Sequence, residues 1–64
     1  MVIVRVKWTD WNGAEHSTDV TSDMCKTLGT PHMDEEDVFC IAIKYIKRRH
    51  TECFYINSVE MIAR

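Results

Sequence analysis

The sequence has few of the residues that interrupt regular structure or cross-link a small fold. It contains two glycines, one proline and three cysteines in 64 residues. Because an odd number of cysteines cannot all pair within one chain, we expect free thiols and a reducing, cytoplasmic environment. With 45% hydrophobic and 28% charged residues, the composition is that of a globular protein and not of a disordered segment. We expect residues 1–64 to form one small domain.

A long apolar run is also missing. The longest one, residues 38–43, is too short to cross a bilayer, and the opening residues MVIVRVKW are too short a run for a signal peptide. Neither sign of charge dominates, since 8 basic residues stand against 10 acidic ones and the net charge is -2. The basic excess typical of nucleic-acid-binding domains is therefore absent, and we expect no membrane contact.

Catalytic motifs are missing too. No glycine-rich loop is present to hold a phosphate, and His16, His32 and His50 have no serine or aspartate at the spacing of a catalytic triad. Cys40 lies inside an expected helix, where no neighbouring base could activate it as a nucleophile. We therefore expect a protein that is not an enzyme and needs no cofactor.

One set of residues could in principle bind a metal ion. Cys25, His32, His50 and Cys53 supply two thiols and two imidazoles, which zinc accepts. Their spacing lacks the close pairs, such as C-x2-C, that are typical of structural zinc sites. Small half-buried cysteines explain the same residues more simply, so we expect no metal site.

Residues 34–50, DEEDVFCIAIKYIKRRH, have the clearest pattern in the chain and predict an amphipathic helix. Asp34 is placed to cap it with Asp37 at the third helical position, while Met33 and Val38 occupy the two positions of a hydrophobic staple. Acidic residues open the helix and basic ones close it, as the helix dipole favours. A step of roughly 100° per residue gives the packing face, which comprises Val38, Phe39, Ala42, Ile43, Tyr45 and Ile46.

Residues 1–10 alternate strictly and predict a half-buried strand. One side carries Val2, Val4, Val6 and Trp8, and the other carries Ile3, Arg5, Lys7 and Thr9. The first side is apolar and is expected to face the helix.

The hairpin that follows can close in two registers. A two-residue turn at Asn12-Gly13 would place Glu15, Ser17 and Asp19 beneath the helix, where burial of polar groups is costly. A three-residue loop, with Gly13 in the left-handed conformation, instead places Trp8 opposite His16. This second register also pairs Val4 with Val20, Val6 with Thr18, Arg5 with Asp19 and Thr9 with Glu15. We predict the three-residue loop.

The remaining segments predict a short helix and a third strand. Residues 21–28 offer Thr21 or Ser22 as a cap, and Gly29 stands just past their end. In the last segment, CFYINSVEMIAR, the apolar pairs Phe54/Ile56 and Val59/Met61 have opposite parity. A bulge near Asn57-Ser58 would let both pairs face inward.

These elements predict an α+β fold of the order β-β-(short α)-α-β. The main helix reverses the chain, so the third strand can pair antiparallel to the first, giving a three-stranded antiparallel sheet of order 2-1-3. The apolar first strand suits the centre and the polar second strand suits an edge. The helix covers one face of this sheet and leaves the other face open.

Basic residues form two groups that lie on opposite layers of this fold. Lys44, Lys47, Arg48 and Arg49 point away from the sheet, whereas Arg5 and Lys7 lie on its open face. Even with Trp11 or Tyr55 as stacking platforms, the two groups cannot act together on one nucleic-acid groove. A solvated helix face is the simpler explanation, and whether Lys44, Lys47 and Arg48 bind anything stays open.

Trp11 at the hairpin tip has few neighbours to bury it, and tryptophan is enriched in interface hot spots. The open face beside it has an apolar end at Ile3 and charges in its middle. We therefore predict that a protein partner binds through Ile3, Arg5, Lys7, Thr9 and Trp11.

The strand VIVRVKW, the hairpin tip DWNG, the helix DEEDVFCIAIKYIKRR and the last strand CFYINSVEMIA together resemble the layout of small phage-encoded proteins that inhibit host enzymes or defence complexes. The resemblance is one of architecture and implies a stoichiometric binder, located in the host cytoplasm if the protein is phage-encoded. We hypothesise a non-enzymatic module that inhibits or regulates a larger protein. The alternative is a small nucleic-acid-binding regulator, and homodimerisation through an edge strand or the open face is a third hypothesis.

Overall fold

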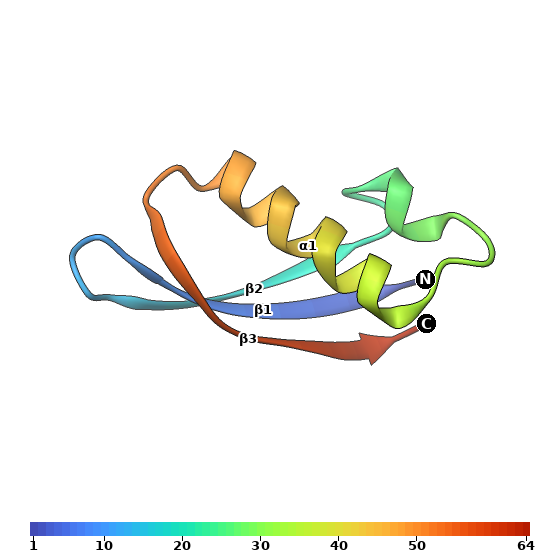
Figure 1. Cartoon of the computed structure of the whole chain (residues 1–64), viewed down its shortest axis with the longest axis horizontal. Coiled ribbons are helices and arrows are strands. Elements are labelled where there is room, and N and C mark those ends of the chain that lie inside the picture. Colours follow the sequence, from blue (N-terminus) through green and yellow to red (C-terminus); the bar gives the residue numbers. More distant parts are fainter.

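A three-stranded antiparallel sheet carries one α-helix on a single face (Figure 1). The computed structural model describes residues 1–64. In chain order the elements are β1 (Ile3–Asp10), β2 (Glu15–Thr21), a 3-10 helix η1 (Lys26–Gly29), α1 (Glu35–Arg49) and β3 (Cys53–Ala63). The strand order is β2-β1-β3, which confirms the predicted α+β class and the central place of the most apolar strand.

The β1–β2 hairpin has the predicted register. Trp8 lies opposite His16 and Val4 opposite Val20. The backbone N–H of Asp10 donates to the Ala14 carbonyl at 3.0 Å, which encloses a three-residue loop, and Gly13 has φ +84°. A Cβ at Gly13 would meet no atom within 4 Å, so the left-handed backbone alone accounts for the glycine.

The helix α1 begins where its cap predicts. The Asp34 carboxylate accepts a hydrogen bond from the Asp37 backbone N–H at 2.9 Å. Three residues spaced four apart are buried against the sheet, namely Val38, Ala42 and Ile46. The prediction included Ile43, but Ile41 packs against the core in its place, beside the core residue Ile46. The packing face is therefore rotated toward the side that meets η1.

The connection between β2 and α1 differs from the predicted helix over residues 21–28. Its regular part is a 3-10 helix that begins only at Lys26, and Gly29 lies inside it. The Thr21 hydroxyl accepts from the Met24 backbone N–H at 3.2 Å and so closes a turn before η1 instead of capping a helix. Leu28 is buried, which explains why the segment lies against the core.

Strand β3 contains three irregularities in its pairing with β1. One leaves Asn57 unpaired between Ile56 and Ser58, which confirms the predicted bulge. The others leave Phe54 and Ile62 unpaired. The prediction that Phe54 faces inward is wrong: the additional bulge turns its side chain outward, and half-buried Cys53 takes the inner position opposite Asp10.

The core lies between α1 and the sheet. It consists of Val4, Val6, Trp8, Val20, Leu28, Val38, Ala42 and Ile46. Figure 1 shows no element over the opposite face of the sheet, so that face is open as predicted. The molecule measures 37 × 18 × 17 Å, and the hairpin extends past the C-terminal end of α1 along the long axis (Figure 1). None of the helices has the length and apolar character needed to span a membrane.

Candidate functional site

Three exposed aromatic side chains gather at the hairpin end of the molecule. Trp11 is 68% exposed, and Phe54 and Tyr55 are each 51% exposed. The ring centroids of Trp11 and Phe54 are 4.4 Å apart, and those of Phe54 and Tyr55 are 5.3 Å apart in an edge-to-face arrangement. We call Trp11, Phe54 and Tyr55 the aromatic cluster. Because the Phe54 ring contacts both of the other rings, the three form one apolar patch and not three scattered residues.

The cluster joins two segments that are distant in the sequence. The Trp11 backbone N–H donates to the Glu52 carbonyl at 3.1 Å, which ties the hairpin tip to the loop that leaves α1. The bulge at Phe54 then turns two successive rings of β3 to the outside. Tyr55 in turn lies opposite Thr9 in the β1–β3 register. The cluster therefore depends on the pairing of both strands with β1.

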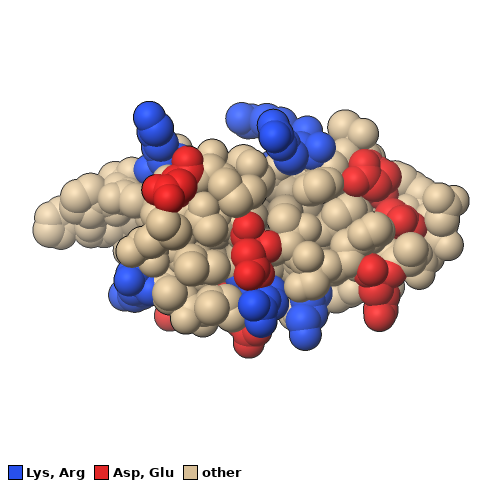
Figure 2. All heavy atoms as spheres, turned by 180° about the vertical axis from the view of Figure 1, so that it is seen from behind, with Lys and Arg blue, Asp and Glu red and all other residues tan.

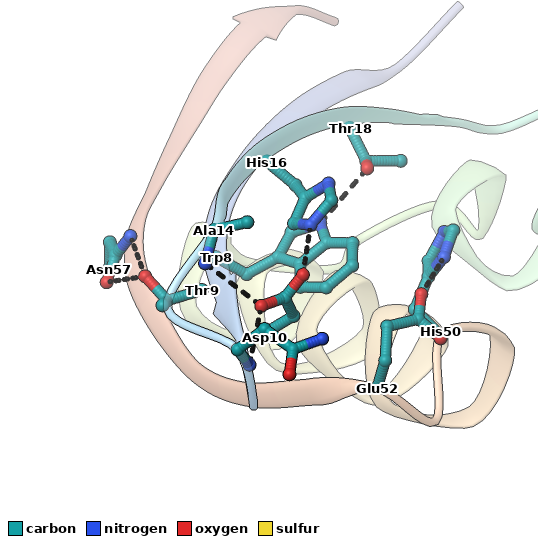
Figure 3. Close-up of polar contacts among 10 residues, drawn as sticks. Trp8, Thr9, Asp10, Ala14, His16, Thr18, His50, Glu52 and Asn57 are labelled. Atoms are coloured by element: carbon teal, nitrogen blue, oxygen red, sulfur yellow. Dashed lines mark hydrogen bonds and ion pairs between the residues drawn. The ribbon is translucent and has the colours of Figure 1, made fainter.

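A buried carboxylate holds the loop beneath Trp11. Asp10 Oδ1 accepts from the backbone N–H groups of Asn12 at 2.8 Å and Ala14 at 2.9 Å, and Asp10 Oδ2 accepts from His16 Nε2 at 2.8 Å (Figure 3). The hydrogen bond from His16 is the largest cause that keeps the pKa of Asp10 below its usual range, and the hydrogen bond from the Ala14 backbone is the second. Asp10 is therefore an ionised anchor for the tip and not a proton donor.

Trp8 links this anchor to the end of α1. Its indole Nε1–H donates to the Thr18 hydroxyl at 3.1 Å, and its ring stacks on His16 with centroids 4.2 Å apart. The His50 ring lies 5.0 Å from Trp8, and His50 Nδ1 is 3.2 Å from Glu52 Oε1 (Figure 3). At the hairpin end, hydrogen-bonded polar side chains therefore surround the one buried indole, that of Trp8.

Thr9, on the other face of the sheet, is covered and does not belong to an open surface. Its side chain is on the outer face of the sheet as expected, but the residue is only 6% exposed. Its hydroxyl donates to Asn57 Oδ1 at 3.2 Å, and Asn57 Nδ2 donates back at 2.9 Å (Figure 3). The bulge that was predicted at Asn57 therefore covers a residue that was predicted to contact a partner.

The other residues of the predicted binding surface differ in exposure and in whether their side chains are already paired. Ile3 is half-buried opposite Ala63, at the far end of the sheet from Trp11. Arg5 Nε donates to Asp19 Oδ1 at 2.9 Å, which raises the pKa of Arg5 and lowers that of Asp19. Lys7 is exposed and belongs to no ion pair. Only Lys7 and Trp11 therefore offer side chains that are both exposed and unpaired.

The thiols and imidazoles are dispersed. The structure gathers no group of three or more His, Cys, Asp or Glu side chains that could hold a metal ion, so Cys25, His32, His50 and Cys53 do not form the set considered from the sequence. All three cysteines are free thiols. Partial burial raises the pKa of Cys53, which disfavours its thiolate.

Charge is mixed around the molecule. Figure 2 shows basic side chains along two opposite margins, with acidic ones between them. Toward the hairpin end the same view shows acidic side chains without basic ones. Glu52, whose carbonyl binds the Trp11 amide, is one of the acidic residues at this end.

Sequence reasoning missed the roles of Phe54 and Tyr55 in this cluster, and the sequence contains a signal for Tyr55 alone. Phe54, Tyr55 and Ile56 are three consecutive large apolar residues. Since neighbouring residues of a strand point to opposite faces, a strand with Phe54 and Ile56 facing inward has Tyr55 facing outward. Phe54 faces outward only because of the second bulge. The role of Asp10 had a weaker signal. An aspartate directly before a turn can accept a hydrogen bond from the backbone N–H two residues later.

Comparisons with known proteins give no relative to argue from. No protein-family model matches the chain, and neither a curated protein nor a solved structure matches it. Function is therefore inferred from the geometry of the molecule alone.

Proposed function

We propose that this protein is a non-enzymatic binding module that inhibits or regulates a larger protein. The observation that carries the proposal is the aromatic cluster, in which Trp11, Phe54 and Tyr55 are exposed and Phe54 contacts both of the other rings. Large exposed apolar patches are uncommon on proteins without partners, and tryptophan and tyrosine are enriched among interface hot spots. The cluster replaces Ile3 and Thr9 as the anchor of the proposed surface, and exposed Lys7 lies beside it.

The size of the molecule is compatible with one such interface. A standard protein–protein interface takes about 800 Å² from each partner, which is roughly a fifth of the 4377 Å² surface of this chain. The hairpin end and the adjoining open sheet face would supply this area. One side of the molecule would then be committed to one partner.

The cluster is also held in place before any partner arrives. Asp10 fixes the tip loop through two backbone N–H groups, and the Trp11 amide is bound to Glu52. Rings that are already ordered lose less conformational entropy on binding, so more of the buried apolar area contributes to affinity.

Inhibition by occupation of a surface is the form of binding that we propose. The layout resembles small phage-encoded inhibitors, and a host enzyme or defence complex is the class of target that this resemblance implies. Binding without catalysis is consistent with an Asp10 that is ionised and fully hydrogen-bonded, and with a Cys53 thiolate that is disfavoured.

Nucleic-acid binding is the competing function, because exposed aromatic rings can stack on bases. Such sites also have a positively charged groove that follows the phosphates. On the face that Figure 2 shows, the hairpin end carries acidic side chains instead. On the open sheet face Arg5 is already paired with Asp19, which leaves Lys7 as the unpaired basic residue beside the cluster. The charges therefore favour a protein partner.

Capture from a lysate of the native host tests the proposal when the bait is varied. The wild-type chain, Trp11→Ala and Ile62→Ala would be immobilised side by side, and the bound proteins identified by mass spectrometry. Ile62 is the matched control, since it is an exposed apolar residue of β3 outside the cluster. We expect one protein to bind the wild type and Ile62→Ala but not Trp11→Ala. Equal capture by all three baits, or capture of nucleic acid that Trp11→Ala retains, would contradict the proposal.

A further inference from the structure

A small cavity lies between η1 and the side of α1 that faces it, away from the aromatic cluster, and both apolar and polar residues line it. Its volume is about 180 Å³, and it is lined by Cys25, Thr27, Ile41, Lys44, Tyr45 and Arg48. The four helical residues recur at intervals of three, one and three, so they form one stripe along α1. This is the side toward which the packing face of α1 is rotated, with Ile41 packed against the core.

The polar side chains around this cavity have no partners within the molecule. Lys44 and Arg48 belong to none of the three ion pairs, which involve Arg5, His16 and His50. The hydroxyls of Thr27 and Tyr45 take part in none of the side-chain hydrogen bonds. No acidic residue is among the lining residues. The residues that line the cavity therefore carry four hydrogen-bond donor groups without a partner in the molecule, and two of these groups are cationic.

This placement of charge is not explained by the stability of the helix. Lys44 and Arg48 are four residues apart, where like charges on a helix repel each other. The helix dipole favours Arg48 in the last turn, but Lys44 lies before that turn. An anion between the two side chains would relieve the repulsion.

We propose that this cavity binds the phosphate group of a small phosphate monoester. Such a group carries a charge of about −1.5 to −2 near neutral pH and three strong acceptor oxygens. Arg48 would bind two of these oxygens in a bidentate manner, and Lys44 would supply the second positive charge. The Thr27 and Tyr45 hydroxyls would donate to the remaining lone pairs, and Ile41 with the Tyr45 ring would contact the organic part.

A small monoester suits the site better than a nucleic-acid backbone. The cavity is smaller than typical pockets for drug-sized ligands, which hold about 300 to 1,000 Å³, so it accommodates little beyond the phosphate and one small group. A backbone phosphodiester carries one charge, and its chain must leave on both sides. The two cations match a terminal phosphate more closely.

Titration of the whole ¹⁵N-labelled chain, followed by amide chemical shifts, tests this inference. The probes are inorganic phosphate, phenyl phosphate and a single-stranded oligonucleotide, all at one ionic strength. We expect phenyl phosphate to give saturable shifts at Thr27, Lys44 and Arg48, and to bind more tightly than the oligonucleotide. Arg48→Gln should weaken this binding by about tenfold or more, because it removes a charge-assisted pair of hydrogen bonds.

Matched variants on the same helix provide the controls. Arg49→Gln and Lys47→Gln remove the same charges from residues outside the cavity, and we expect them to bind phenyl phosphate within about twofold of the wild type. Tyr45→Phe, which keeps the ring, should weaken binding by the loss of one hydroxyl. Trp11→Ala should leave it unchanged, so this result is independent of the proposed protein partner. Absence of saturable shifts, equal losses in Arg48→Gln and Arg49→Gln, or tighter binding of the oligonucleotide would each overturn the inference.

Discussion

The half of the sheet beneath α1 and the hairpin end beyond it are built by different means. Under the helix, Val4, Val6 and Ala42 are buried by apolar contacts alone. The hairpin end lies beyond the end of the helix, and there hydrogen bonds of Asp10 and Thr9 order the chain instead. The stability of the fold explains the residues of the first region. The second orders three aromatic rings that then stay exposed, which stability alone does not explain.

Trp8 lies at the boundary of the two regions, and its replacement should have the largest effect. Trp8 is 2% exposed, so we expect Trp8→Ala to lower the free energy of unfolding by about 3 to 5 kcal/mol. Trp11→Ala, which removes the same side chain from the exposed tip, should lower it by less than about 1 kcal/mol. Urea denaturation of both variants measures the contrast. Similar losses would mean that the tip is part of the core.

The hydrogen bond between Thr9 and Asn57 should contribute less than Trp8 but more than an exposed pair. We expect Thr9→Val, which keeps the shape of the side chain, to cost about 1 kcal/mol of unfolding free energy. The control is Thr27→Val, an exposed threonine outside the sheet. Urea denaturation checks both, and an equal effect in the two variants would show that the bulge at Asn57 does not depend on this bond.

Replacement of Asp10 should loosen the tip without disturbing the region under the helix. In Asp10→Asn we expect the amides of Asn12 and Ala14 to exchange with solvent about tenfold faster, since they lose a charged acceptor. Amides of α1 should be unaffected. Hydrogen exchange followed by NMR makes this comparison, and uniform acceleration throughout the chain would contradict the separation of the two regions.

The same carboxylate predicts a pH dependence. Because the pKa of Asp10 in the folded protein lies below the reference value of 3.8, its stabilising contribution is fully present above pH 3.8 and is lost as pH falls through the lower, folded-state pKa. The difference in unfolding free energy between the wild type and Asp10→Asn should therefore shrink below pH 3.8. Urea denaturation at a series of pH values tests the sign, and a difference that grows in acid would contradict it.

The smallest effect is expected at the exposed pair in the middle of the open face. Arg5 and Asp19 are about 40% and 43% exposed, so solvent and salt screen their interaction. We expect Arg5→Met to leave the urea midpoint unchanged within error at moderate salt. A clear loss would show that the open face is covered in solution, for instance by a second copy of the chain.

The same contrast explains what the sequence could predict. Under the helix, the period-2 pattern of β1 and the capped pattern of residues 34–50 each depend on local geometry, and both predictions were confirmed. The bulge at Asn57 was also visible, because the parity of Val59 and Met61 reverses there. These features can be predicted without knowing which distant segments contact one another.

The hairpin end could be predicted only in part. Exposure of Trp11 followed from its place at a tip, but its contact with Phe54 joins residues 43 positions apart. That contact depends on a second bulge, and Phe54 by itself fits an inward position equally well. The burial of Thr9 likewise depends on Asn57, which approaches only after β3 has paired. The cavity beside Lys44 requires the 3-10 helix, whose residues gave no helical period.

The most direct test of the proposed function is the affinity of the captured partner for variants of the aromatic cluster. Isothermal titration calorimetry would compare the wild type with Trp11→Ala, Phe54→Ala and Ile62→Ala. If the cluster is the hot spot of the interface, Trp11→Ala should cost at least about 2 kcal/mol, a loss of roughly thirtyfold, with Phe54→Ala close behind and Ile62→Ala near the wild type. All four proteins should unfold at similar urea concentrations. Equal affinities for all four would contradict the account.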